Sequence, residues 1–138
     1  MSVHFFSEGI DFVLPHPRKT SQWIKFMIKK EGKILNSINY IFCSDLYLLQ
    51  INQQYLNHST LTDIVTFDYS QKTKLEGEIY ISIDRVKENS ETYDRPFDEE
   101  LHRVIIHGVL HLVGYKDKSK AEKSLMRKKE EACLSLRK

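Results

Sequence analysis

Two histidines, His107 and His111, stand four residues apart in an apolar stretch of the chain. In an α-helix, residues four apart lie on one face with Cβ atoms roughly 6 Å apart, which allows two imidazoles to bind one ion. The spacing therefore predicts part of a metal site. A catalytic zinc normally has three protein ligands and an open position for water, so a third ligand must come from elsewhere.

Asp117 is the candidate for the third ligand. Gly114 follows the last apolar position of the expected helix, where a glycine commonly lets the chain turn back. Residues 115–118 can then fold past the helix end. Two neutral histidines and one carboxylate leave a net charge of about +1 with a divalent ion, so bound water is acidified less than in a three-histidine site. The same ligand set suits iron(II), so the ligand types leave the metal open.

Two other interpretations of this segment stay open. A histidine pair in an apolar helix can be two half-buried imidazoles that bind no metal. The HExxH motif of zinc peptidases carries its general base directly after the first histidine, but this chain has Gly108 there. Because glycine cannot transfer a proton, the sequence argues against such a peptidase, and it identifies no general base.

The surrounding elements alternate between strands and helices. Residues 97–113 have helical periodicity with acidic residues in the first turn, and Ser119 with Glu122 forms a capping-box pattern for a final helix. Alternation and β-forming residues indicate the strands, and helical spacing indicates the other helices. The expected strand regions are 3–8 with 10–14, 37–44, 63–69 and 76–83, and the other expected helices are 21–30, 45–56 and a short one from 84 toward 93.

Length and composition limit the class of protein. A chain of 138 residues without linkers or repeats is expected to form a single domain, residues 1–138. No uncharged apolar run approaches the roughly 20 residues of a membrane span, and the N-terminus lacks a secretory pattern, so we expect a cytoplasmic protein. Cys43 and Cys133 are far apart, and we interpret both as reduced structural thiols.

Basic residues are concentrated at the C-terminal end. The net charge is only +2, but nine lysines and arginines lie between residues 116 and 138. Interleaved glutamates favour a solvated helix face, and an RNA-facing surface is the alternative.

The pattern His107-Gly-x-Leu-His111-Leu-x-Gly114-Tyr115 resembles the signature of the YbeY family of bacterial rRNA-maturation metalloendoribonucleases. Two upstream segments agree in their order. Residues 62–67, TDIVTF, are similar to the Thr-Asp-Val-Leu-Ser-Phe strand of the family. Residues 77–82, GEIYIS, resemble its Gly-Asp-Ile-x-Ile-Ser strand. The resemblance covers about residues 45–118.

The resemblance implies an α+β fold, with a small mixed β-sheet of about four strands covered by helices and a zinc site at the end of a long helix. It implies a single-strand-specific endoribonuclease with one Zn²⁺ ion, acting in 3′-end processing of 16S rRNA and in ribosome quality control. The expected partners are rRNA and the small ribosomal subunit or the 70S ribosome. No membrane partner is expected, and the oligomeric state stays open.

Two positions depart from the family pattern. The family usually has its third histidine where this chain has Asp117, so the metal is assigned to His107, His111 and Asp117 by position. The family commonly has an arginine where this chain has Leu56, so phosphate must be held by another group. The candidates for RNA contact are His58, Lys116, Lys118 and Tyr115.

Two further function classes remain open at this point. One is a non-catalytic ribosome assembly factor with a structural zinc, which the Leu56 departure favours. The other is a metal-dependent hydrolase of another substrate, which Gly108 disfavours in the case of peptides.

Overall fold

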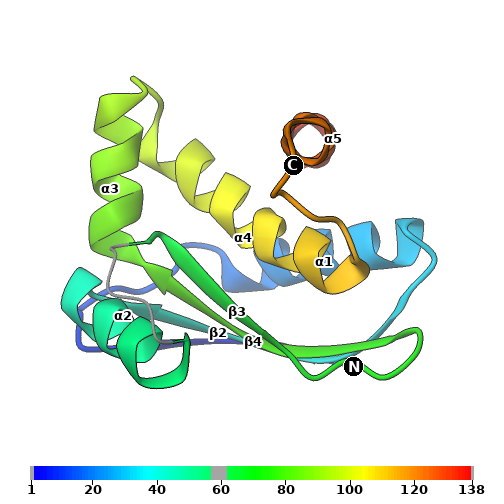
Figure 1. The fold of residues 1–138 in the computed structure, drawn as a ribbon, viewed down its shortest axis with the longest axis horizontal. Coiled ribbons are helices and arrows are strands. Elements are labelled where there is room, and N and C mark those ends of the chain that lie inside the picture. The colour runs from blue at the N-terminus through cyan, green and yellow to red at the C-terminus, as the bar shows by residue number, and fades with distance from the viewer. Residues whose placement is uncertain (1, 57–61, 138) are drawn as a thin grey trace.

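A four-stranded sheet with the order β1-β2-β4-β3 lies at the centre of the computed structural model, which describes residues 2–56 and 62–137 (Figure 1). The three strands β1, β2 and β4 run parallel, whereas β3 is antiparallel to β4 and forms an edge. The mixed α+β fold implied by the resemblance is confirmed. The strands are β1 (Ser2–Glu8), β2 (Ile34–Cys43), β3 (Ile64–Asp68) and β4 (Lys74–Ser82).

Helices cover both faces of this sheet unequally. In Figure 1, α1 and α4 lie on one face with α5 outside them, whereas α2 lies on the other face. Among the described residues, no helix combines the length and apolarity needed to cross a membrane. The helices are α1 (Pro17–Lys30), α2 (Asp45–Ile51) with its π-helical continuation η1 (Asn52–Leu56), α3 (Ile83–Thr92), α4 (Phe97–Val113) and α5 (Lys120–Ser135).

The main core lies between the sheet and α1 and α4. Tyr40 of β2 is fully buried there, and its hydroxyl donates to the Ile105 carbonyl of α4 at 2.9 Å. A β-carbon on Gly108 would lie 2.9 Å from Ile79 Cδ1 and 3.2 Å from Ile64 Cδ1. Glycine therefore permits the close approach of α4 to the sheet, and a larger residue would overpack the core by roughly 1–3 kcal/mol. This packing fixes the helix that carries both histidines.

The structure confirms the predicted end of α4 at Gly114 and the predicted start of the last helix at Ser119. Gly114 has a φ of 126°, a conformation that residues with a Cβ rarely adopt, and it ends the helix. The Ser119 hydroxyl accepts from the Glu122 N–H at 3.0 Å, and Glu122 Oε1 accepts from the Ser119 N–H at 2.8 Å, which completes the predicted capping box. The connection 115–118 is therefore anchored at both ends.

The N-terminal region differs from its prediction. Residues 10–14 are not a strand, because Gly9 turns the chain out of the sheet with a φ of 68°. Phe12 and Leu14 pack on the core instead. The first helix also begins at Pro17, four residues before the predicted start at Ser21, because proline suits the first helical position.

Both cysteines are buried and free. Burial raises the pKa of the Cys43 thiol to about 12 and that of the Cys133 thiol to about 11. These thiols are therefore poor nucleophiles and have the environment of structural residues, as the sequence indicated.

Candidate metal centre

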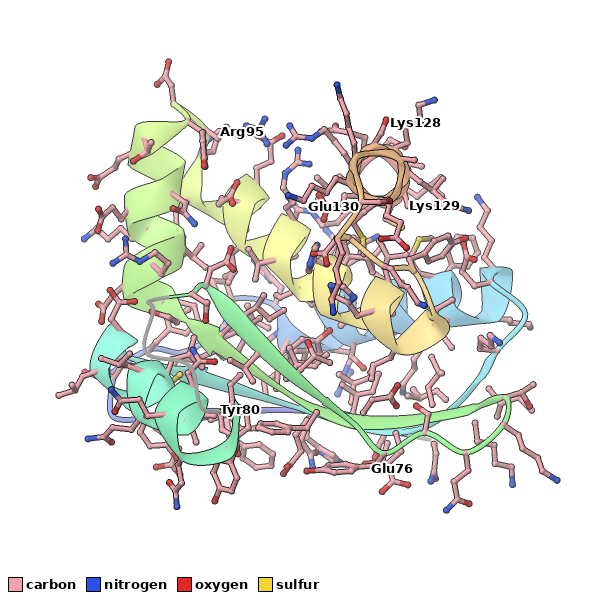
Figure 2. All side chains as sticks on the ribbon, viewed as in Figure 1. Glu76, Tyr80, Arg95, Lys128, Lys129 and Glu130 are labelled. Carbon is pink, nitrogen blue, oxygen red and sulfur yellow. The ribbon has the colours of Figure 1, made fainter. Side chains whose placement is uncertain are left out.

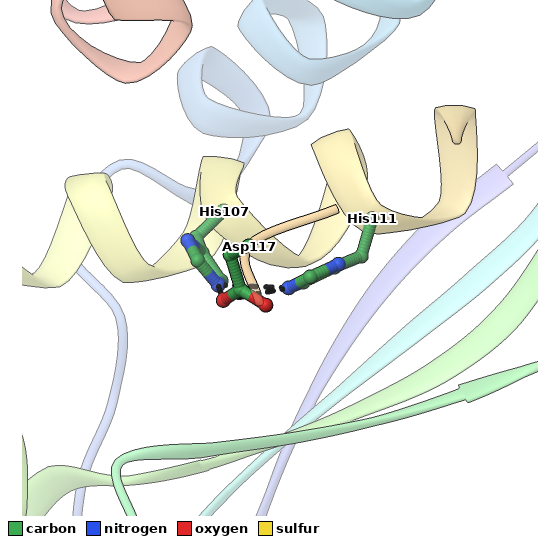
Figure 3. A group of neighbouring side chains, drawn as sticks. All are labelled: His107, His111 and Asp117. Carbon is green, nitrogen blue, oxygen red and sulfur yellow. Dashed lines mark hydrogen bonds and ion pairs between the residues drawn. The ribbon is translucent and has the colours of Figure 1, made fainter. Parts of the chain in front are cut away.

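The side chains of His107, His111 and Asp117 converge at the C-terminal part of α4 (Figure 3). His107 Nε2 lies 3.0 Å from His111 Nε2 and 3.2 Å from Asp117 Oδ2, and His111 Nε2 lies 3.3 Å from the same oxygen. Ligands about 2.0–2.1 Å from a tetrahedral zinc lie about 3.3 Å from one another. The three atoms thus have the spacing of one face of a zinc coordination tetrahedron.

Local structure explains this convergence. One turn of α4 separates the two histidines, and their rings lie edge to face with centroids 4.6 Å apart. Gly114 reverses the chain, so Asp117 returns past the helix end to the same point. The structure therefore brings together the three residues that the sequence assigned to the metal.

A carboxylate from α5 orients the His107 ring through Nδ1, the ring nitrogen on the side away from Asp117 and His111. His107 Nδ1 donates to Glu130 Oε2 at 2.5 Å, which leaves Nε2 with a lone pair directed at Asp117 and His111. Glu130 is only 8% exposed, and its other carboxylate oxygen accepts from Arg103 Nη1 at 3.3 Å. The ring orientation of His107 thus depends on the packing of α5 against α4.

Sequence reasoning missed Glu130, because it treated the charged residues of the last helix as a solvated face. Figure 2 shows Glu130 on the side of α5 that faces α4. Met126 and Cys133, four residues before and three after, are buried on the same face. The signal was therefore present: a charged residue occupied an apolar-stripe position.

The charges around His107 favour a cation. Burial lowers the pKa of His107, but the hydrogen bond and charge of Glu130, with the charges of Asp117 and Asp63, outweigh it and raise that pKa. The negative charges that stabilise an imidazolium also stabilise a bound metal ion.

The three side chains border an open cleft of about 380 Å³. Its other wall comes from the region before β3 and from β3 itself, including Thr62 and Thr66. The buried Asn52 of η1 donates from Nδ2 to Thr62 Oγ1 at 2.9 Å, which holds this wall in place. Beside Thr62, the Asp63 carbonyl accepts from the Ser82 N–H at 2.9 Å, and burial raises the pKa of the Asp63 carboxyl. The β3 side of the cleft therefore carries polar groups among the apolar Ile64 and Val65, and hydrogen bonds hold it in place.

The predicted RNA-contacting residues have different positions. Lys116 and Lys118 are exposed on either side of Asp117. Tyr115 is half-buried: its hydroxyl donates to Glu31 Oε1 at 2.8 Å, and Lys129 Nζ lies 5.1 Å from its ring centre. These contacts give Tyr115 a packing role, and stacking on a base stays a prediction. His58 and the side chain of Leu56 lie outside the described part of the chain.

Comparisons with known proteins agree with this site and fold. The family model described as Endoribonuclease YbeY matches residues 14–137. Two proteins named Endoribonuclease YbeY are similar over nearly their whole length. That of Flavobacterium psychrophilum is 54% identical over 131 residues, which cover 95% of this chain and 94% of the relative. That of Cytophaga hutchinsonii is 50% identical over 138 residues, with coverage of 99% and 96%.

The solution structure of a Thermotoga maritima protein has a similar fold. It superposes with a TM-score of 0.64 at 27% sequence identity, over 97% of this chain and 90% of that one. The matches to the family model and to the named relatives extend across almost all of the sequence. This chain therefore belongs to the YbeY family of endoribonucleases.

Proposed function

We propose that this protein is a zinc-dependent, single-strand-specific endoribonuclease that acts in 3′-end processing of 16S rRNA and in ribosome quality control. One observation carries the metal dependence: two imidazole nitrogens and a carboxylate oxygen lie within 3.3 Å of one another. Three electron-pair donors at this separation repel one another unless a proton or a cation lies between them.

The donor set suits zinc in number, type and spacing. Zinc held by His107, His111 and Asp117 supplies Lewis acidity, which stabilises charge developing on a phosphodiester and acidifies water. Glu130 holds the His107 ring with Nε2 toward the cleft. Asp117 contributes a negative charge that a third histidine would lack, so we expect weaker acidification of water than in a three-histidine site.

The cleft suits an RNA backbone. The Thr62 and Thr66 hydroxyls can contact sugar and phosphate oxygens, and the exposed Lys116 and Lys118 attract phosphate beside Asp117. The proposed partners are rRNA and the small ribosomal subunit or the 70S ribosome, in the cytoplasm. Family membership supports this choice of partners.

The test compares metal content and RNA cleavage. Protein purified without added metal is analysed for bound elements and incubated with single-stranded RNA that contains the 16S 3′ end, and with a duplex of the same sequence. We expect about one zinc per chain and cleavage of the single strand, lost after chelation and restored by zinc. His111→Ala should lack both, whereas His4→Ala, which changes an exposed histidine on β1, should retain both.

Metal content and cleavage that survive both His111→Ala and chelation would refute the proposal. A highly purified protein that binds zinc and ribosomal subunits but cleaves no RNA would instead be a non-catalytic assembly factor. Cleavage of other esters or peptides, without cleavage of RNA, would identify a hydrolase of another class.

Two substitutions at Asp117 test its assignment as a ligand. Asp117→Asn should lower zinc affinity because it removes the ligand charge, and Asp117→His should retain or raise it because imidazole restores a strong nitrogen ligand. Competition with a zinc-binding dye measures both affinities. If Asp117→Asn binds zinc as tightly as the unmodified protein, Asp117 is only a turn residue.

A further inference from the structure

A second pocket lies across the sheet from the metal centre. Its volume is about 360 Å³, and its walls come from α2 with η1 and from β3 with β4. Figure 2 shows Tyr80 of β4 on the side of the sheet where α2 lies, away from α4. The aromatic residues that line this pocket, called here the aromatic pocket, are Tyr47, Tyr55, Phe67, Tyr69 and Tyr80.

The rings of the aromatic pocket hold one another in place. Tyr47 and Tyr80 stack with centroids 6.4 Å apart, and Phe67 makes edge-to-face contacts with Tyr55 at 5.9 Å and with Tyr80 at 5.8 Å. The Tyr69 ring is held instead through its hydroxyl, which donates to Glu78 Oε1. Tyr55 is nevertheless 61% exposed and Tyr69 51% exposed. Fixed rings with open faces form a preorganised surface on which a planar ligand can stack.

The polar groups of the pocket match the edges of nucleobases. The Gln50 and Gln54 amides carry both donors and acceptors, and the Glu78 carboxylate accepts. Glu78 Oε1 already accepts from the Tyr69 hydroxyl at 3.2 Å, which leaves its other oxygen for an amino or imino group. The described lining includes no lysine or arginine. This chemistry favours an uncharged base over a phosphate.

The aromatic pocket and the metal cleft share two walls. Along β3, Thr66 and Asp68 line the cleft, whereas Phe67 lines the aromatic pocket and Tyr69 follows on the same side. This is the alternation of side chains along a strand. In η1, Asn52 lines the cleft, and Gln54 and Tyr55 line the aromatic pocket. Because β3 is an edge strand, no further strand of the described sheet lies beyond the boundary between the cleft and the aromatic pocket.

We propose that the aromatic pocket binds unpaired nucleobases of the RNA strand whose backbone occupies the metal cleft. This inference rests on the proposed function for the identity of the ligand as single-stranded RNA. Bases that stack on Tyr55 and Tyr69 hold the strand against the edge of the sheet. Base-paired RNA cannot present its bases in this way, so the pocket also selects single strands.

The test measures binding without cleavage. In the His111→Ala background, fluorescence anisotropy follows a labelled single-stranded RNA and the same RNA with abasic nucleotides. Tyr55→Ala combined with Tyr69→Ala should weaken binding of the intact RNA by about tenfold or more, because each base stacked on an aromatic ring contributes strongly to the affinity for RNA. Tyr55→Phe combined with Tyr69→Phe should retain binding, because the rings remain. Phe26→Ala, which removes a 55% exposed ring from α1, is the matched control.

Two further readouts identify the bases as the contact. Abasic RNA should bind equally to the double alanine variant and to its parent, and the effect of the alanines should not change with salt because no phosphate contact is lost. Crosslinking of 4-thiouridine RNA should label peptides within residues 47–80 in the parent and not in the double alanine variant. Thermal melting of both proteins verifies that the variant is folded.

Unchanged RNA affinity and unchanged crosslinks in the double alanine variant would overturn the inference. A loss of affinity that persists with abasic RNA would also overturn it. Retained RNA binding with lost binding to ribosomal particles would assign the pocket to a protein partner instead. Failure of the unmodified protein to cleave RNA would refute the proposed activity but would leave this binding result intact, so the two proposals fail separately.

Discussion

Two histidines on α4, His102 and His107, have opposite environments although they lie only five positions apart. His102 is 3% exposed between α1 and α4. Its Nδ1 donates to the Asp98 carbonyl at 2.7 Å, and its Nε2 lies 3.3 Å from the Thr20 hydroxyl, from which it accepts. Both ring nitrogens are therefore occupied by groups of the protein, with the Asp98 carboxylate oxygen Oδ1 also 3.4 Å from Nδ1, and burial lowers the pKa of His102.

His107 has one nitrogen held by the protein and one available. The carboxylate of Glu130 accepts from Nδ1, and Nε2 faces the cleft beside His111 and Asp117. The difference shows which surroundings suit a histidine of this fold to bind a metal ion. A carboxylate accepts from one ring nitrogen and fixes the ring, and the other ring nitrogen faces an open cleft that contains a second carboxylate.

The largest expected effect is the loss of metal from His107→Ala. Removal of one of the three proposed ligands should lower zinc affinity by more than about 100-fold. This loss exceeds the loss expected when a residue that is only hydrogen-bonded to a ligand is changed. Elemental analysis and dye competition measure this loss. The comparison of the two histidines is wrong if His107→Ala keeps its zinc while His102→Ala loses it.

A smaller loss is expected from Glu130→Gln. The amide oxygen can still accept from His107 Nδ1, but the negative charge that makes the ring a stronger ligand is gone. Zinc affinity should fall about 10–100-fold. Glu131→Gln is the matched control, because Glu131 is exposed and pairs with Arg103 without touching His107. Equal affinities in the two variants would show that Glu130 does not act on the metal site.

The two histidines also differ in how well the sequence predicted them. Helical spacing predicts His107 and His111, and Gly114 lets Asp117 reach them, but the assignment of Asp117 as third ligand also depends on the resemblance to the family pattern. Glu130 occupies an apolar-stripe position of α5, which indicates its burial, but its contact with His107 depends on the packing of α5 against α4, which no local pattern specifies. The buried position of His102 is likewise not predictable from a local pattern, because its contact with Thr20 joins two helices that are far apart in sequence.

The aromatic pocket was missed for the same reason. Its rings come from α2, η1, β3 and β4, and each tyrosine read alone is an ordinary strand or helix residue. Apart from residues 10–14, the predicted strand regions are strands in the structure, because alternation is visible within each segment. The order β1-β2-β4-β3 depends on pairings between distant segments. The pairing of β3 with β4 places Phe67 beside Tyr80, and η1 brings Tyr55 against Phe67 from the other side of the pocket.

His102→Ala should affect stability and leave the metal unchanged. The substitution removes a buried ring and two hydrogen bonds, which should lower the free energy of unfolding by about 2–4 kcal/mol. Urea unfolding of the metal-free protein measures this loss, and dye competition at low temperature measures zinc affinity. His4→Ala, at an exposed position, should change neither quantity. A large loss of zinc affinity in folded His102→Ala would remove the distinction between the two histidines.

The smallest expected effect is a pH dependence of stability that His102 contributes. Burial lowers the pKa of His102, although the hydrogen bond to the Asp98 carbonyl opposes this shift. In the unfolded chain the pKa is about 6.5, so below that pH the unfolded chain binds a proton that the folded chain does not. His102 should therefore lower the free energy of unfolding as the pH falls from about 6.5 through its folded pKa, by at most about 1.4 kcal/mol per pH unit. Urea unfolding from pH 7.5 to 5 in the presence of a chelator should show a steeper decline for the unmodified protein than for His102→Gln, and parallel curves would contradict a buried neutral imidazole.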